Sequence, residues 1–143
     1  MVSNVTLIRS HALAETPGYA YASVTEAGTR LIHLAGACPL DADGTVVGAG
    51  DYAGQAAKCI ENLNSALAAA GASLEDVAYT RVLVATQRNE DLGTVWDVVR
   101  DAFAEHEVPS TLFGVTVLGY RNQLVEIEAV AAIADEARRQ DLA

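Results

Sequence analysis

The chain has 143 residues, 51% of them hydrophobic and 20% charged, which is enough for one buried core and predicts a single domain over residues 1–143. Nine Lys and Arg against nineteen Asp and Glu leave a net charge of −10, so we expect neither nucleic acid nor an anionic membrane as a partner. Two cysteines cannot form a disulfide framework, and the first residues lack the pattern of a signal peptide. We therefore expect a cytoplasmic protein.

The first third of the chain predicts three strands, at residues 5–9, 19–25 and 30–35. Ala27, Gly28 and Thr29 lie between the last two and are typical of a tight turn. These two strands are therefore expected to form a hairpin.

Residues 51–70 predict a helix, because their apolar residues recur every three or four positions. Asp51 can cap its start and Gly71 its end. The apolar face of this helix is rich in alanine, so we expect the helix to pack closely against a sheet. A strand follows at 77–86.

The second half predicts a helix from Asn89 and two strands at 112–118 and 124–133, joined by a turn at 119–122. The apolar stripe expected on this helix consists of Val95, Val98, Val99, Ala102 and Phe103. The order of elements indicates an α+β domain with helices on one face of the sheet. Strand 124–133 is apolar on both sides, so further subunits are expected on the other face.

Motifs for phosphate, dinucleotide or zinc binding are absent from the sequence. His11, His33 and His106 are isolated from one another and from both cysteines. We therefore expect neither a cofactor nor a metal.

Single polar and aromatic residues leave several interpretations open. Glu126 and Glu128 lie on one side of a strand, where they could share acid and base roles or form a solvated or ion-paired face. Cys38 and Cys59 are interpreted as small buried hydrophobes, and His33 as a hydrogen-bonded structural histidine. The only tryptophan, at position 96, could line a pocket or pack half-buried.

Three segments of the chain resemble the RidA/YjgF proteins. They are the helix and turn at 51–77, with Gln55 and Asn62; the strand LVEIEAVA at 124–131; and the segment 34–41, in which Gly36, Pro39 and Asp41 match. The resemblance implies a chorismate-mutase-like α+β fold, a mixed sheet of about six strands with two helices on one face. It also implies a homotrimer whose sheets line the middle, with pockets between subunits.

The resemblance further implies hydrolysis of reactive enamines and imines to 2-oxo acids and ammonia, without a cofactor. Proteins of the family have also been described as translation inhibitors or endoribonucleases. The net charge of −10 argues against such a role here, because it disfavours binding of RNA. Carried over residue by residue, the resemblance predicts Glu126 as the catalytic residue. The predicted ligand-binding residues are Tyr21, Gly36, Trp96, Thr111 and Phe113.

The match to the family site is incomplete, since Thr111 stands where the family has an arginine that binds the substrate carboxylate. The family serine and glutamine flanking Gly36 are Ala35 and Ala37, and Trp96 and Phe113 replace an asparagine and a cysteine. Such a pocket favours a larger or uncharged imine, enamine or carbonyl compound. The alternative is a trimer that binds a metabolite, or acts in regulation, without turnover; a purely structural role ranks third.

Overall fold

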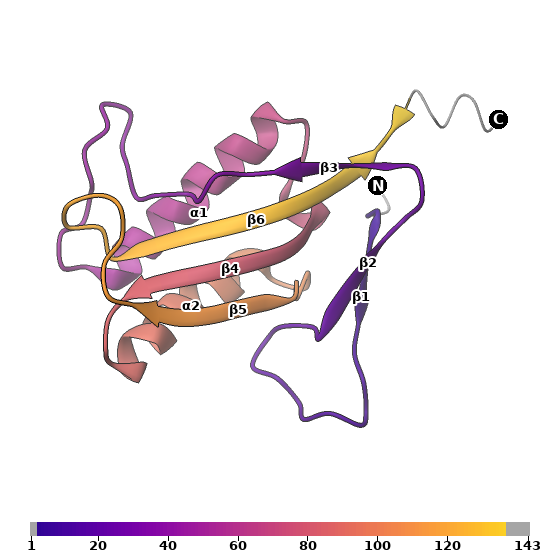
Figure 1. Ribbon diagram of the computed structural model, residues 1–143, viewed down its shortest axis with the longest axis horizontal. Helices are drawn as coiled ribbons and strands as arrows, with labels where there is room; N and C mark the ends of the chain where they lie inside the picture. Colours follow the sequence, from indigo (N-terminus) through magenta and orange to yellow (C-terminus); the bar gives the residue numbers. More distant parts are fainter. Residues whose placement is uncertain (1–2, 137–143) are drawn as a thin grey trace.

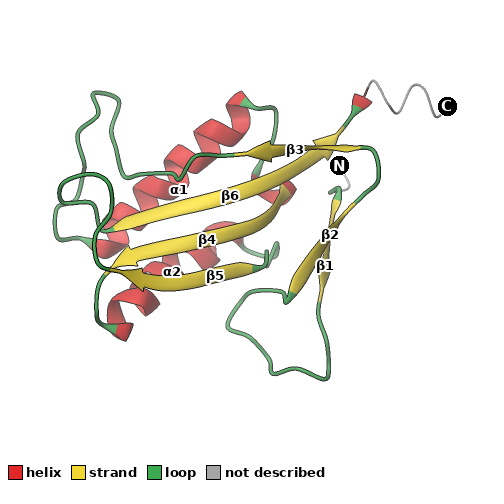
Figure 2. Ribbon diagram, viewed as in Figure 1, coloured by secondary structure: helices red, strands yellow, loops and turns green. Residues whose placement is uncertain are grey.

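Residues 3–136 are described by the computed structural model, and they form six strands, two helices and one short 3-10 helix (Figure 2). The ends of the predicted domain, 1–2 and 137–143, lie outside the described residues. In chain order the elements are β1 Val5–Ile8, β2 Ala22–Thr25, β3 Thr29–His33, α1 Tyr52–Ala69, η1 Leu74–Asp76, β4 Val77–Ala85, α2 Asn89–Phe103, β5 Ser110–Val115 and β6 Val125–Ala134.

Four strands form a mixed sheet in the order β3-β6-β4-β5, and both helices lie on one face of it (Figure 1). Strands β4 and β5 are parallel, whereas β6 is antiparallel to both of its neighbours. The core lies between this sheet and the helices. The predicted α+β fold, with two helices on one face and six strands, is confirmed; two of the strands form a separate ribbon.

Helix α1 begins and ends where the sequence predicts. The Asp51 carboxylate accepts a hydrogen bond from the backbone N–H of Gly54 at 2.9 Å, and Gly71 follows the helix at φ +83°. Its buried face carries Ala56, Cys59, Ile60, Leu63 and Leu67. Cys59 is fully buried, as its interpretation as a core residue requires.

Helix α2 buries Val95, Trp96, Val99 and Phe103. Trp96 belongs to this buried face, since only 9% of it is exposed, and its indole N–H donates to the carbonyl oxygen of Pro17 at 2.8 Å. The predicted stripe is thus displaced toward Trp96, while Val98 and Ala102 lie at its partly buried margin.

The hairpin predicted between 19–25 and 30–35 is wrong. Strand β2 pairs with β1 in the two-stranded ribbon, whereas β3 pairs with β6 in the main sheet (Figure 1). Gly28, at φ +77°, does turn the chain, but the turn leads from one sheet to the other. A local turn signal cannot specify the partner of a strand, because a distant edge can offer the better pairing.

The main sheet leaves the face opposite the helices uncovered over much of its area, and we call this surface the open face. Strand register places on it Tyr79, Arg81, Leu83, Thr111, Phe113, Glu126, Glu128 and Val130. Leu31 and Tyr79 are 53% and 38% exposed. At one end Val5 of β1 covers Ala78 and Ala132. Among the described residues, the helices are too short or too polar to span a bilayer.

Candidate functional site

Glu126 lies on β6 with its carboxylate held from one side. Its Oε1 accepts a hydrogen bond from the Cys38 thiol at 3.1 Å and another from the Gln123 side-chain amide at 3.3 Å. Within the described part of the chain no donor bonds to Oε2. One carboxylate oxygen is therefore fixed, and the other is available to accept a hydrogen bond from water or a ligand.

Gly36 permits this position of Glu126. A Cβ atom at residue 36 would lie 2.6 Å from the Glu126 carboxylate. The segment is anchored to β6, because Ala37 and Ile127 exchange both backbone hydrogen bonds, at 2.7 and 3.1 Å. The glycine is thus required by the close approach of the two strands, which places the predicted Gly36 and Glu126 in one site.

Two polar residues of α1 hold the loops around this site. The Asn62 amide donates to the carbonyl oxygens of Cys38 and Leu40, both at 2.8 Å. The Gln55 amide donates to the carbonyls of Gly48 and Asn122, and the N–H of Leu124 donates to its side-chain oxygen at 2.7 Å. The motif residues Gln55 and Asn62 therefore position the site from the helix side.

Cys38 differs from its sequence interpretation as a buried hydrophobe, because it is only partly buried and donates to a carboxylate. Burial raises the pKa of this thiol, and the Glu126 carboxylate raises it further, to about 11. The thiol is consequently neutral at pH 7 and acts as a hydrogen-bond donor. The sequence could not place Glu126 beside it, since 88 residues separate the two.

Alkylation of Cys38 by iodoacetamide should show this raised pKa. Only the thiolate reacts, so we expect the rate to rise with pH around a midpoint near 11 instead of the ordinary 9.0. Glu126→Gln should move the midpoint toward 9.0, although burial still keeps it above that value. Peptide mapping by mass spectrometry separates Cys38 from the fully buried Cys59. A midpoint of 9.0 in the unsubstituted chain would mean that the thiol and the carboxylate lie apart.

The predicted pair of glutamates is divided between the two interpretations. Glu128 forms an ion pair with Arg81 at 3.3 Å, and the Arg81 guanidinium lies over the Phe113 ring, 5.3 Å from its centre. Glu128 thus belongs to an ion-paired strand face, whereas Glu126 faces Cys38 and Gln123. Of the two carboxylates, that of Glu126 lies outside this ion pair.

Thr111 on the outer strand β5 and Trp96 on α2 line a pocket of about 370 Å³ together with Tyr19. The Tyr19 and Trp96 rings are in an edge-to-face contact, with centres 6.1 Å apart. The Thr111 hydroxyl shares a hydrogen bond of 2.9 Å with the hydroxyl of Tyr79. The pocket is therefore lined by two aromatic rings and by a hydroxyl that already has a partner.

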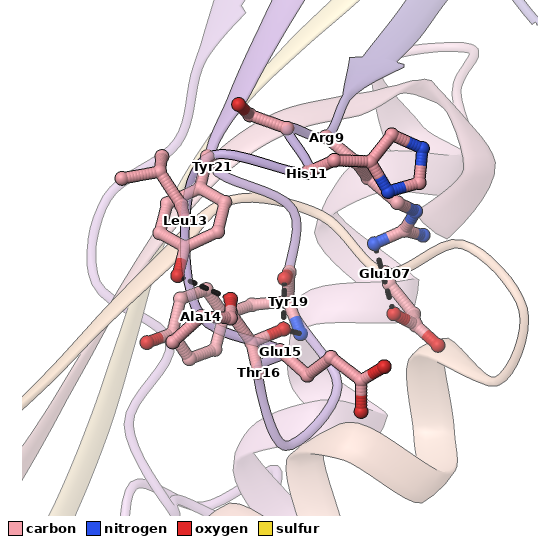
Figure 3. A pocket seen from close by; sticks show the side chains of 10 residues that line it. Arg9, His11, Leu13, Ala14, Glu15, Thr16, Tyr19, Tyr21 and Glu107 are labelled. Atoms are coloured by element: carbon pink, nitrogen blue, oxygen red, sulfur yellow. Dashed lines mark hydrogen bonds and ion pairs between the residues drawn. The ribbon is translucent and has the colours of Figure 1, made fainter.

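Tyr21 lies in a neighbouring pocket of about 570 Å³, formed by the loop between β1 and β2 (Figure 3). Its hydroxyl donates to the carbonyl of Ala14 at 2.6 Å. Arg9 closes one side through an ion pair with Glu107 at 3.1 Å. Tyr19 lines both pockets, so its ring connects the two places.

The predicted site residues thus occupy separate places in one chain. Gly36 touches Glu126, Thr111 lines a pocket with Trp96, and Tyr21 lines another. Sequence reasoning missed Gln123 and Tyr19 and had no role for Arg81. Alternation along strand 77–86 puts Arg81 beside Tyr79 and Leu83, but only the pairing of β4 with β5 brings it to Phe113.

The three histidines do not form a metal site. No group of three His, Cys, Asp or Glu side chains that could hold a metal ion occurs within residues 3–136. His106 is the hydrogen-bonded histidine, with its Nε2 2.7 Å from the carbonyl of Val77. The hydrogen-bonded role predicted for His33 is wrong, because its side chain is exposed on edge strand β3 and bonds to none of the described residues.

Residues 10–133 match the family model described as Endoribonuclease L-PSP. The chain is similar to the crystal structure of YyfB from Yersinia pestis, a protein of unknown function of the conserved Rid family, at 26% identity and a TM-score of 0.85 over 91% of this chain and 99% of that one. It also resembles Rv2704 of Mycobacterium tuberculosis, a member of the YjgF/YER057c/UK114 family, at 28% identity and a TM-score of 0.61 over 90% and 99%. None of the curated proteins compared with the chain matches it.

Proposed function

Since the chain belongs to the Endoribonuclease L-PSP family, with the Rid and YjgF proteins, we propose that it hydrolyses a reactive enamine or imine to a carbonyl compound and ammonia. The observation that carries the proposal is the Glu126 carboxylate, with Oε1 held by two donors and Oε2 free of donors among the described residues. A carboxylate in this state can orient and deprotonate a water molecule.

The reaction needs only water and a proton carrier. An enamine first takes a proton on carbon and loses one from nitrogen, which gives the imine. Glu126 then accepts a proton from water as the water oxygen bonds to the C=N carbon, and it passes that proton to the nitrogen. The adduct now carries a hydroxyl and an amino group on one carbon. Glu126 takes the hydroxyl proton and passes it to the amino nitrogen as the C–N bond breaks, so that ammonia and the carbonyl compound leave and no cofactor is consumed. The neutral Cys38 thiol and the Gln123 amide hold the carboxylate in place through these proton transfers.

The substrate we propose is other than the usual small 2-imino acids. Thr111 offers a hydroxyl to the pocket that it lines, and that hydroxyl is already bonded to Tyr79. Trp96 and Tyr19 line the same pocket with aromatic surface. Aromatic walls stabilise a ligand by burying its apolar area, so a larger side chain on the substrate is favoured.

We also propose that the chain works as a homotrimer in the cytoplasm. The open face exposes Leu31 and Tyr79, which a second copy would bury. Glu126 lies on β6 and the Thr111 pocket on the outer strand β5, so a neighbouring chain could bring the two parts of the site together. Light scattering should give about 45 kDa for three chains of 15.0 kDa. A mass of 15.0 kDa at assay concentration would contradict the trimer.

RNA is a poor ligand for this surface in spite of the family description. Five of the seven Lys and Arg side chains in the described residues are paired with carboxylates, namely Arg9, Lys58, Arg81, Arg88 and Arg100. With a net charge of −10, few cations remain to contact phosphates. A small molecule is the ligand that we propose.

A coupled assay tests the activity. A dehydratase generates 2-aminoacrylate or 2-iminobutanoate, an amino-acid oxidase generates imines with larger side chains, and the 2-oxo acid is timed with and without the protein. We expect acceleration, greatest for the larger imines. Equal rates with and without the protein for every imine would contradict the proposal.

The second candidate is a trimer that binds a metabolite without turnover. It is favoured by Thr111, whose hydroxyl is bonded to Tyr79 and which cannot replace a cation. This function predicts a rise in melting temperature with a 2-oxo acid or an aromatic metabolite, together with no acceleration in the coupled assay. The two measurements therefore separate the candidates.

A further inference from the structure

We propose that Tyr19 is the specificity-determining residue that limits the length of the substrate side chain, because its ring lies between the pocket of Thr111 and the pocket of Tyr21. The inference rests on the proposed function and adds to it the size of the substrate. It predicts a side chain that ends in a single ring. It also predicts that removal of the Tyr19 ring admits a ligand with a polar extension on that ring.

Tyr19 is the one residue that the two described pockets share. The smaller pocket, of about 370 Å³, is lined by residues of α2 and β5. The larger one, of about 570 Å³, is lined mostly by the loop between β1 and β2 (Figure 3). A ligand that reaches from one pocket into the other must therefore pass the Tyr19 ring.

The Tyr19 ring is held between two aromatic neighbours. Its centre lies 6.1 Å from that of Trp96 and 6.2 Å from that of Tyr21, and both contacts are edge-to-face. The backbone of Tyr19 is held separately, because the Thr16 hydroxyl donates to its carbonyl oxygen at 2.5 Å and accepts from its N–H at 3.3 Å. Substitution of the side chain should therefore remove the wall between the pockets and leave the loop in place.

The two pockets offer different groups to a ligand. In the smaller one, the hydroxyls of Ser110 and Thr111 are already bonded to other side chains, so the remaining surface is mostly apolar. The larger one contains the ion pair of Arg9 with Glu107 and the carboxylate of Glu15. An apolar ring is therefore favoured in the smaller pocket, and a group with hydrogen-bonding atoms in the larger one.

Calorimetry on the full chain tests the inference with two probes, phenylpyruvate and a derivative that carries a hydroxyethoxy arm on the para carbon of the ring. We expect the unsubstituted protein to bind phenylpyruvate at least about 10-fold more tightly, since one methylene group too many in a closed pocket already costs about that much. Tyr19→Ala should reduce this preference to less than about 2-fold or reverse it. Tyr19→Phe keeps the ring and should keep the preference.

Two further variants complete the experiment. Tyr19→Leu keeps an apolar side chain between Trp96 and Tyr21 but shortens the wall, so it should lose part of the preference even if unfolding curves show that Tyr19→Ala does not fold. Tyr120→Ala is the matched control, because Tyr120 is 50% exposed and lines neither pocket. It should bind both probes as the unsubstituted protein does.

The inference would be overturned by equal affinity for both probes in the unsubstituted protein, by binding of neither probe, or by a full preference that persists in folded Tyr19→Ala or Tyr19→Leu. Failure of the proposed function looks different: the preference between probes would depend on Tyr19 while no imine is hydrolysed. An amino-acid oxidase supplies the two corresponding imines. Their hydrolysis at equal rates by the unsubstituted protein would leave the function standing and refute the role of Tyr19.

Discussion

Glu126→Gln is expected to lower kcat/KM for imine hydrolysis by at least about 100-fold, the usual contribution of a positioned general base. The amide keeps the size of the side chain and an oxygen that can accept from the Cys38 thiol, so the fold should persist. It cannot take a proton from water, however. The coupled assay measures the loss, and the unfolding curve shows whether the variant is folded.

Glu61→Gln is the matched control for this substitution. Glu61 is an exposed carboxylate of α1, paired with Lys58 at 3.0 Å, and the helix lies on the other face of the sheet. We expect its activity to be unchanged, and the exposed ion pair contributes only about 0.3–0.5 kcal/mol to stability. A folded Glu126→Gln variant with full activity would show that water is activated by another group.

Gln55→Leu should lower the free energy of unfolding by about 3 kcal/mol or more, since each buried group left without a partner costs about 1–3 kcal/mol. Gln55 is fully buried and serves the carbonyls of Gly48 and Asn122 and the N–H of Leu124. Leucine has a similar size but satisfies none of the three. Urea unfolding followed by circular dichroism measures the change.

Gln87→Leu provides the comparison, because Gln87 is exposed and its side chain bonds to none of the described residues. Its free energy of unfolding should change by less than about 0.5 kcal/mol. If the free energy of unfolding fell by less than about 0.5 kcal/mol in both variants, the loops around Glu126 would be held by residues other than Gln55. A large loss in Gln55→Leu together with a fall in activity would confirm that α1 positions the site.

Elements with a strong local cause were predictable. The bounds and the buried face of α1 follow from nearby residues, namely its alanine-rich apolar face, the Asp51 cap and Gly71. In β6, the Leu-Val-Glu-Ile-Glu run predicts the alternation of buried and partly exposed side chains. Resemblance supplied the family, which the family model confirms, and it singled out Glu126 and Gly36, which the structure brings into contact. The sequence left Trp96 either lining a pocket or packed half-buried, whereas it is only 9% exposed and lines a pocket as well. Its partner Pro17, 79 residues away, could not be predicted.

The partners of strands and side chains were decided only by the tertiary structure. The turn at Gly28 carries no information on which edge β3 will join, so the predicted hairpin was wrong. Cys38 and Glu126 are distant in sequence and come together because the 34–41 segment pairs with β6. Arg81 is likewise distant from Thr111 and Phe113, and the pairing of β4 with β5 brings them together. Local pattern determined which elements form and which sides of them are apolar. Pairing across the sheet determined which charges meet, because register is set by contacts between segments that lie far apart in the chain.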